Sequence, residues 1–322
     1  MVQTGTRTAF ITGITGQDGG YLAEQLMAEG ASVHGLVRSA AEVAPTAAAY
    51  PGATLHVADL TDTAAVAGLL GEIGPDEIYN LGGISSVARS WQEPVTTGAV
   101  SGLAAAGVLQ AAWELAERDG RPVSVVQASS AEIFGNPAAA PQTEDTPIAP
   151  VTPYGAAKAY AHHMARVFRG RGLAASTVIL YNHESPRRPP AFVTRKITQG
   201  AARIARGEQD ELALGNLDAR RDWGWAPDYV DAMVRAARHP VADDYVIATG
   251  RAHSVREFVA AAFTAAGVDD WERYVRVDPA FVRPVDAVEL TGDATRARTA
   301  LGWAPTVGFD EVVARMVRAD LQ

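Results

Sequence analysis

The chain has 322 residues, of which 48% are hydrophobic and 20% charged, a composition typical of a soluble globular protein with one large α/β unit or two joined domains. Its formal net charge is −9 and it has no run of basic residues, so neither nucleic acid nor an anionic membrane is an expected partner. The absence of cysteine excludes disulfides, thiolate metal sites and a cysteine nucleophile, and we expect no metal site. Residues Met1–Phe10 contain no apolar signal core and no stretch approaches membrane-spanning length, which predicts a cytoplasmic protein.

Strand and helix signals alternate along the first half of the chain. Strand-like apolar runs are Thr8–Ile11, Ser32–Val37, Thr54–Val57, Glu77–Leu81, Val123–Gln127 and Ser176–Leu180. Helical periodicity is present through Leu22, Leu26 and Met27, and over Ala64–Ile73, Leu103–Ala116 and Tyr154–Phe168. This alternation predicts an α/β fold with a Rossmann-type doubly wound parallel sheet, whose ligands bind at the carboxyl ends of the strands. Pro45 favours a loop over a helix in Ala44–Tyr50.

A glycine-rich turn follows the first predicted strand. Thr12–Gly19 places glycines at three-residue spacing, which a Rossmann fold uses for a tight turn, for close approach to a pyrophosphate and for helix packing. The start of the following helix supplies amide donors for the anion. A merely structural turn is the alternative. The expected cofactor contacts here are Gly13, Thr15, Gly16, Gln17, Asp18 and Gly19.

The residue after the second strand indicates which cofactor binds. Arg38 stands where an NAD-binding chain often has an acid, and its cation suits the 2′-phosphate of NADP, although a solvated loop arginine is the alternative. Asp59, followed by Leu60 after the third strand, is placed to accept from the adenine amino group. The segment Leu81–Ser85 lies where the chain passes under the cofactor. We therefore expect NADP, with Arg38, Asp59, Leu60, Leu81 and Ser85 among its contacts.

The composition and the secondary-structure pattern of the sequence change after Asn182. Residues 184–190 are rich in proline and charge, and later strand signals are short and scattered. We therefore expect an NADP-binding Rossmann domain over residues 1–181, completed by residues 224–250 with a late strand at Tyr245–Ala248. Residues 182–322 would mostly form a smaller, interleaved C-terminal lobe that binds the substrate.

Tyr154 and Lys158 are one helical turn apart and share a helix face. An ammonium beside a phenol favours the phenolate, which predicts a lowered tyrosine pKa, and the lysine can also hold the nicotinamide ribose. Ser130 ends a predicted strand, so its hydroxyl can meet the same substrate oxygen as Tyr154. A solvated helix face is the alternative for the pair. With the dinucleotide turn, this placement resembles the short-chain dehydrogenase/reductase superfamily.

Glu132 indicates which reaction of this superfamily the chain carries out. It stands two residues after Ser130, on the same side if the backbone is extended. A simple dehydrogenase or 4-epimerase needs only the serine, tyrosine and lysine, whereas a carboxyl beside the reacting hydroxyl suits elimination of water from a ketone. An exposed loop carboxylate is the alternative.

Several longer segments are similar to the GDP-mannose 4,6-dehydratase family over essentially the whole chain. They are Ile11–Gly19, Tyr181–Arg188, Phe192–Ile197, Leu214–Asp218, Arg221–Gly224, Ala226–Val230, Arg283–Pro284 and Gly292–Asp293. The resemblance implies that His183 and Arg188 help to hold NADP. It also implies a site for the GDP-sugar lined by Asn182, Val193, Lys196, Leu214, Asn216, Arg221 and Arg283.

Two departures from the family pattern have consequences. The family has threonine, serine and glutamate in the catalytic loop, where this chain has Ser130, Ala131 and Glu132, so a hydroxyl is lost at Ala131. The loop Arg38–Gly52 is shorter and richer in alanine than the family's arginine- and serine-rich loop that joins subunits into a tetramer. We therefore expect a homodimer formed through two long helices per subunit, with a tetramer as the alternative.

The resulting hypothesis is conversion of GDP-mannose to GDP-4-keto-6-deoxymannose and water, by internal hydride transfer through a tightly bound NADP. Tyr154, aided by Lys158 and Ser130, would take the C4 hydroxyl proton, and Glu132 would remove the C5 proton and protonate the departing C6 hydroxyl. Three alternatives remain. They are a 4,6-dehydratase for a UDP- or dTDP-sugar, a nucleotide-sugar 4-ketoreductase or epimerase, and a cofactor-sensing binding module that has lost catalysis.

Overall fold

A seven-stranded sheet forms the centre of the protein. The computed structural model describes residues 6–281 and 289–322. The strands are β1 (Thr8–Thr12), β2 (Ser32–Val37), β3 (Thr54–Val57), β4 (Glu77–Asn80), β5 (Ser124–Ser130), β6 (Ala174–Leu180) and β10 (Asp244–Ile247). They are all parallel and lie in the order β10-β6-β5-β4-β1-β2-β3. The predicted doubly wound Rossmann-type sheet is confirmed, and β10 is the late strand expected near Tyr245.

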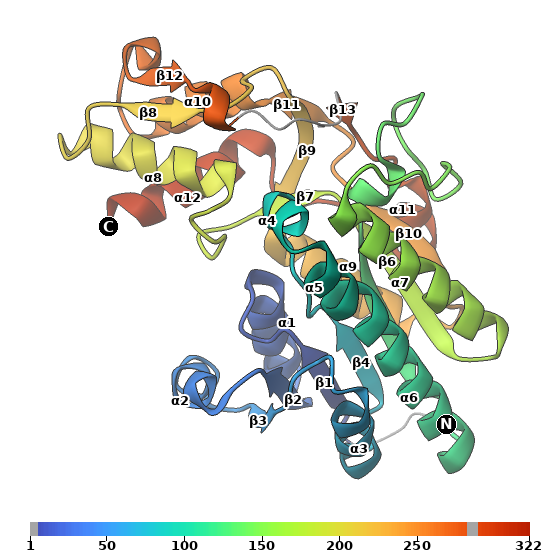
Figure 1. Cartoon of the computed structure of the whole chain (residues 1–322). Helices are drawn as coiled ribbons and strands as arrows, with labels where there is room; N and C mark the ends of the chain where they lie inside the picture. Colours follow the sequence, from blue (N-terminus) through green and yellow to red (C-terminus); the bar gives the residue numbers. More distant parts are fainter. Residues whose placement is uncertain (1–5, 282–288) are drawn as a thin grey trace.

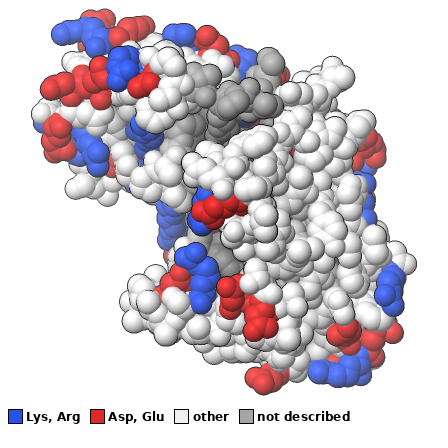
Figure 2. Space-filling view, in the orientation of Figure 1, with Lys and Arg blue, Asp and Glu red and all other residues white. Residues whose placement is uncertain are grey.

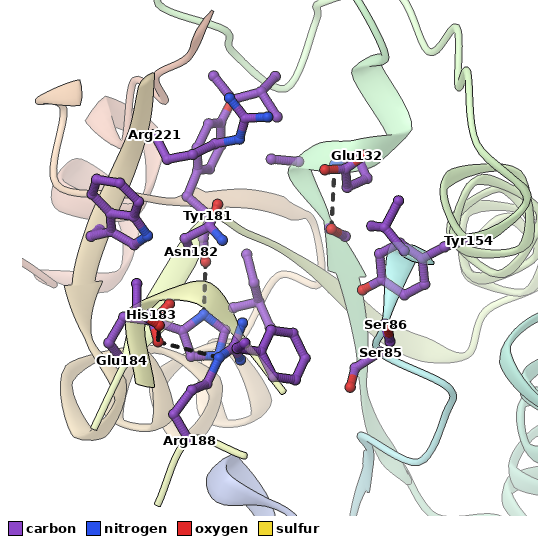
Figure 3. Close-up of a pocket in the computed structure, with 18 of the residues that line it drawn as sticks. Ser85, Ser86, Glu132, Tyr154, Tyr181, Asn182, His183, Glu184, Arg188 and Arg221 are labelled. Carbon is purple, nitrogen blue, oxygen red and sulfur yellow. Dashed lines mark hydrogen bonds and ion pairs between the residues drawn. The ribbon is translucent and has the colours of Figure 1, made fainter. Parts of the chain in front are cut away.

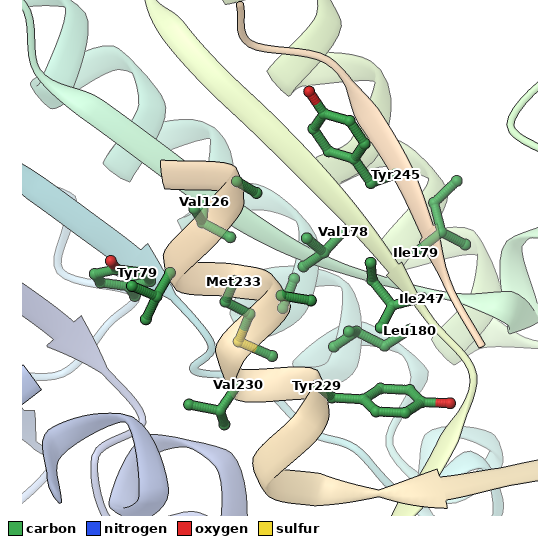
Figure 4. Packing of buried hydrophobic residues seen from close by; sticks show 14 of the residues in the cluster. Tyr79, Val126, Val178, Ile179, Leu180, Tyr229, Val230, Met233, Tyr245 and Ile247 are labelled. Atoms are coloured by element: carbon green, nitrogen blue, oxygen red, sulfur yellow. The ribbon is translucent and has the colours of Figure 1, made fainter. Parts of the chain in front are cut away.

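Helices cover both faces of this sheet (Figure 1). One face carries α1 (Gln17–Ala28), α2 (Ala40–Ala49), α9 (Ala226–Arg238) and α11 (Thr295–Leu301), and the other carries α3 (Thr63–Ile73), α6 (Ala104–Asp119) and α7 (Pro153–Gly170). Strands buried on both faces read as continuous apolar runs rather than alternating ones. Figure 4 shows α9 lying on the sheet, and its Val230 and Met233 belong to the same buried apolar cluster as Val126 and Val178 of the strands.

Helix α2 contradicts the sequence expectation of a loop over Ala44–Tyr50. It runs from Ala40 to Ala49 with Pro45 inside it. A proline in a helix interior removes one backbone hydrogen bond and costs about 3 kcal/mol. The other residues offset this cost because most of them are alanine, the best helix former, and because Glu42 lies in the first turn, where a negative charge is favourable.

Apart from α9, β10 and α11, the chain after β6 forms a smaller body above the sheet edge, and a deep cleft separates this body from the large sheet in Figure 2. Its strands are β7 (Asn182–Glu184), β8 (Leu212–Leu214), β9 (Arg220–Trp225), β11 (Ala252–Ser254), β12 (Val275–Val277) and β13 (Glu289–Leu290). Strand β9 pairs with β7, β11 and β13, and β8 pairs with β12. Helices α8 (Val193–Ala205), α10 (Val255–Ala265) and α12 (Phe309–Leu321) pack together on a separate apolar cluster.

Residues Pro94–Asp119 correct the expectation that no stretch approaches membrane-spanning length. They form one continuous helical run made of α5 (Pro94–Gly98), a π-helical turn (Ala99–Leu103) and α6. The run is long and apolar enough to cross a membrane by length and composition, but half of it is buried inside the protein. The core helix of a globular protein passes the same test, so this run is weak evidence for a membrane span.

Candidate active site

A pocket lies where the carboxyl edge of the large sheet meets the small one. The chain crosses it in one step, because β6 ends at Leu180 and β7 begins at Asn182 and pairs with β9. In Figure 3, Asn182, His183, Arg188 and Arg221 lie on one side, and Glu132, Tyr154 and Ser85 lie on the other. The lining includes these predicted site residues: Asp18, Leu81, Ser85, Ser130, Glu132, Tyr154, Lys158, Asn182, His183, Arg188, Val193 and Arg221.

Helix α7 brings Tyr154 and Lys158 into the pocket. The Thr152 hydroxyl caps its first turn by accepting from the amide of Gly155 at 3.0 Å, and Pro153 occupies the first helical position, where it is tolerated. Lys158 is buried and its Nζ donates to the carbonyl oxygen of Ala128 at 2.9 Å. That bond, from the helix to the end of β5, fixes the amine at the pocket floor.

The pKa of Tyr154 differs from the sequence expectation. Burial raises it to about 12, although a hydrogen bond with Ser130 opposes the rise and the nearby charge of Glu132 adds to it. The expected lowering by Lys158 is wrong for this arrangement, because Nζ lies 6.0 Å from the centre of the tyrosine ring and is bonded to Ala128. Burial also lowers the pKa of Lys158 to about 8.

Glu132 lines the pocket, but its backbone is not extended as the sequence suggested. Strand β5 ends at Ser130, and Ala131–Phe134 forms a 3-10 turn whose first donor, the Glu132 amide, bonds to the Ser130 hydroxyl at 3.3 Å. Ala131 is buried in the core beneath the turn. Gly155 permits α7 to pack here, since a Cβ at that position would lie only 2.5 Å from the Glu132 carbonyl oxygen.

His183, which is buried, forms an ion pair with the partly buried Asp18 in the pocket lining. Its Nε2 lies 2.9 Å from the Asp18 carboxylate and its Nδ1 lies 2.7 Å from the Tyr181 carbonyl oxygen. Both ring nitrogens therefore face acceptors, an arrangement that suits the doubly protonated ring. Burial lowers the pKa of His183, but the charge and hydrogen bond of Asp18 outweigh it and the net shift is upward. Burial has the opposite effect on Asp18 and raises its pKa, but the charge and hydrogen bond of His183 outweigh it, so the net shift of the Asp18 pKa is downward.

Arg188 is held by Glu184, a residue that sequence reasoning did not assign to the site. The Glu184 carboxylate is 1% exposed, lies 3.2 Å from Arg188 Nε and accepts from the Thr194 hydroxyl at 2.6 Å. The Arg188 guanidinium stacks 3.8 Å from the centre of the Phe192 ring. The available signal was the presence of a glutamate inside the Tyr181–Arg188 motif.

The glycine turn is as tight as its sequence predicts. Gly13 adopts a φ of +77°, and a Cβ there would lie 3.0 Å from the backbone of Gly82. A Cβ at Gly19 would overlap the Gly13 carbonyl oxygen, so Gly19 allows α1 to start against the turn. Thr15 and Gly16 are exposed at the open side of the turn.

Gln17 is buried rather than free for a ligand. Its side-chain amide donates to the His183 carbonyl at 3.1 Å and to Asp18 at 3.0 Å, and it accepts from the Ser185 hydroxyl at 2.8 Å. These bonds connect the first helix to the segment after β7. The side chain therefore positions Asp18 and His183.

Side-chain hydrogen bonds connect the ends of three strands next to the segment Leu81–Ser85. None of these bonds was predicted from the sequence. Thr12 donates to Asn80 at 2.7 Å, and Asn80 donates to Gln127 at 2.7 Å, which ties β1, β4 and β5 together. The Thr12 hydroxyl also accepts from the amide of Gly82 at 2.9 Å.

Besides the turn residues Gly13, Thr15, Gly16, Gln17 and Gly19, three predicted cofactor contacts lie outside the pocket lining. The side chain of Arg38 is 80% exposed and pairs with Glu42 at 2.6 Å. Asp59 accepts from the amide and hydroxyl of Thr61. Leu60 is buried in the core on the α3 side of the sheet.

Some of the predicted substrate residues line the pocket and others lie outside its lining. Asn182, Val193 and Arg221 line the pocket, whereas Leu214 is buried in the core of the small body and Asn216 accepts from the amide of Asp218 at 2.9 Å. Outside the lining, Lys196 places its Nζ 3.6 Å from the centre of the Phe281 ring. Arg283 lies outside the described residues. Among residues 6–281 and 289–322, no group of three or more acidic, histidine or cysteine side chains is placed to hold a metal ion.

A parallel sheet with a tight glycine turn and a Tyr154–Lys158 pair at its carboxyl edge defines a dinucleotide-binding protein of the short-chain dehydrogenase/reductase type. A family model described as GDP-mannose 4,6 dehydratase matches residues 10–316. The chain therefore belongs to the GDP-mannose 4,6 dehydratase family.

Individual proteins agree with this assignment. GDP-mannose 4,6 dehydratase 2 of Arabidopsis thaliana is 43% identical over 98% of this chain and 87% of its own length. GDP-mannose 4,6 dehydratase of Homo sapiens is 42% identical over 98% of this chain and 91% of its own. Among solved structures, UDP-glucose 4-epimerase of Thermus thermophilus in complex with NAD has a TM-score of 0.83 at 26% identity, covering 97% of this chain and 98% of that one. UDP-glucose 4-epimerase of Thermotoga maritima with UDP-glucose has a TM-score of 0.86 at 22% identity over 97% and 98%, a likeness of fold.

Proposed function

We propose that the protein dehydrates GDP-mannose to GDP-4-keto-6-deoxymannose with a bound NADP. The observation that supports this best is the carboxyl of Glu132 in the same pocket as Tyr154, close enough for its charge to raise the tyrosine pKa. Proton removal next to a ketone needs such a base, and a plain 4-epimerase or ketoreductase does not. Family membership and relatives at 42–43% identity favour GDP-mannose as the substrate.

The residues present fit a nicotinamide dinucleotide. The Gly13 turn leaves no space for a side chain against Gly82 and ends in a helix start with free amide donors. Ser129 lines the pocket, and among the described residues its buried hydroxyl has no hydrogen-bond partner, so it is available to a ligand. When bound, the nicotinamide would accept hydride from the sugar and return it, which leaves the cofactor unchanged after each turnover.

The side chains of this pocket would then have distinct roles. Tyr154, hydrogen-bonded to Ser130, takes the C4 hydroxyl proton, and Lys158, which lines the same pocket, would hold the nicotinamide ribose. Glu132 removes the C5 proton and passes it to the leaving C6 hydroxyl, which departs as water; C6 would then take back the hydride and C5 would be reprotonated. The 3-10 turn and Gly155 hold these two groups on one side of the sugar.

The opposite side of the pocket carries the groups suited to the rest of the nucleotide sugar. Asn182 and Arg221 face the catalytic groups across the pocket (Figure 3). Arg188 and His183 are cations beside the start of α1; the Arg188 guanidinium could bind a diphosphate through bidentate, charge-assisted bonds, whereas both ring nitrogens of His183 are already paired and it adds only positive charge. We assign Arg188 and His183 to the cofactor, and Asn182, Val193 and Arg221 to the GDP-sugar. The second candidate is the same dehydration of a nucleotide sugar that carries another nucleobase, such as a UDP- or dTDP-sugar.

We also propose that two copies associate through α6 and α7. The supporting observation is a set of large apolar side chains exposed near or along these helices, namely Leu103, Tyr160 and Val167, which are 61%, 42% and 54% exposed. An interface between copies would cover these exposed apolar side chains.

Replacing Glu132 tests the assignment of the chemistry. Glu132→Gln keeps the shape of the side chain and removes the base, so the variant should oxidise C4 and then stop, giving reduced nicotinamide that accumulates on the enzyme. Tyr154→Phe provides the contrast, because it should lose the oxidation as well. Rapid-mixing absorbance of the reduced nicotinamide and mass spectrometry of the sugar distinguish the two. Dehydration by Glu132→Gln at the wild-type rate would show that another group is the base.

A further inference from the structure

A second charged contact lies at the outer end of the cleft, where β2 leads into α2. The carboxylate of Glu42 accepts three hydrogen bonds from Arg38: from its backbone amide at 3.0 Å, from Nε at 3.0 Å and from Nη2 at 2.6 Å. The pair is spaced i,i+4 and the arginine is the more exposed partner. Arg38 is therefore oriented by Glu42 rather than extended freely into solvent.

This corner is the place where a Rossmann fold distinguishes its cofactors. The residue after the second strand meets the adenosine ribose, which carries a hydroxyl in NAD and a phosphate in NADP. Strand β2 pairs directly with β1, whose end leads into the Gly13 turn. Ser39 is the N-cap of α2 and makes no side-chain bond to the helix.

The charges at the corner do not favour a phosphate as strongly as Arg38 alone would. Glu42 engages two of the five guanidinium N–H donors. Asp59 is a second nearby carboxylate, whose pKa is lowered mainly by hydrogen bonds from Thr61 and partly by the charge of Arg38. One guanidinium thus faces two carboxylates. A dianionic phosphate brought to this corner gains from Arg38 and is repelled by Glu42 and Asp59.

We propose that Glu42 sets the cofactor selectivity of this protein, by competing with the 2′-phosphate for Arg38, so that the site accepts NAD as well as NADP. The inference rests on the proposed function for the presence of a nicotinamide dinucleotide. In NADP the phosphate shares Arg38 with Glu42, and in NAD the Arg38–Glu42 pair stays intact beside the ribose hydroxyls. Glu42 is a specificity determinant and takes no part in the chemistry of the sugar.

Competitive loading of the purified protein tests this. The protein is equilibrated with equal excesses of NAD and NADP, freed of unbound nucleotide and denatured, and the released nucleotides are quantified by chromatography. The wild type should retain both, and Glu42→Gln should shift the ratio toward NADP by about tenfold, the factor that corresponds to about 1.4 kcal/mol. Arg38→Ala should shift it toward NAD. Higher salt should narrow the difference between wild type and Glu42→Gln, because the pair is exposed.

Glu311→Gln is the matched control. It removes the same charge from another exposed pair at four-residue spacing, with Arg315 on α12, far from β2 in the fold. Its retained ratio should equal that of the wild type. An unchanged ratio in Glu42→Gln, or a wild type that retains NADP and no measurable NAD, overturns the inference.

The loading result is independent of turnover. A shifted ratio in a protein that leaves GDP-mannose unchanged would uphold the role of Glu42 and refute the proposed reaction. Retention of neither nucleotide would refute both.

Discussion

Substitution of Gly155 tests how the catalytic groups are held together. A Cβ at this position would lie 2.5 Å from the Glu132 carbonyl oxygen and 3.1 Å from Pro150 Cβ, whereas ordinary contact begins at 3.4 Å. Gly155→Ala therefore forces α7 and the Glu132 turn apart by about 0.9 Å, and such overpacking costs about 1–3 kcal/mol. A displacement of about 1 Å between reacting groups lowers turnover on the order of 100-fold.

Gly170 at the other end of α7 supplies the control. A Cβ there meets nothing within 4 Å, so Gly170→Ala should leave turnover unchanged and, by helix propensity, stabilise the fold by up to about 1 kcal/mol. Urea unfolding gives the free energy of unfolding of both variants, and mass spectrometry of the sugar gives their turnover. Wild-type turnover and stability in Gly155→Ala would refute the idea that this glycine sets the spacing of Tyr154 and Glu132.

Further predictions concern the ionic groups at the base of the pocket. Glu184→Gln should lower the free energy of unfolding by about 3 kcal/mol, because it leaves the Arg188 charge without its buried partner; a urea midpoint equal to wild type would contradict this. The Asp18–His183 pair should stabilise the fold fully between pH 3.8 and pH 6.5. This stabilisation is lost as pH rises through the raised pKa of His183, and as pH falls through the lowered pKa of Asp18. In Asp18→Asn that pH dependence of the melting temperature should disappear, and its persistence would assign the effect to other groups.

Most of the large sheet could be predicted from local sequence. Strands β1 to β6 are apolar runs that alternate with helical periods, and a parallel sheet buried on both faces is the arrangement that such a pattern permits. The prediction failed at α2, where a rule about one residue, Pro45, was given more weight than the alanines around it.

The site was predictable where its geometry is local and less so where it depends on packing. One helical turn separates Tyr154 from Lys158, so the sequence alone places them on one face. The bond from Lys158 to the Ala128 carbonyl connects residues 30 positions apart, and the tyrosine pKa depends on its burial and on Ser130 and Glu132, which lie on other elements. The pairing of Arg38 with Glu42 had a local signal, the four-residue spacing, that the sequence interpretation did not use.

Mass spectrometry of GDP-mannose incubated with the purified protein, without added cofactor, tests the central proposal most directly. We expect the sugar nucleotide to lose the mass of one water, because Glu132 and Tyr154 complete an elimination that returns the cofactor to its starting state. An unchanged mass, with UDP- and dTDP-hexoses also unchanged after NADP and NAD are added, would contradict the assignment of this pocket to dehydration.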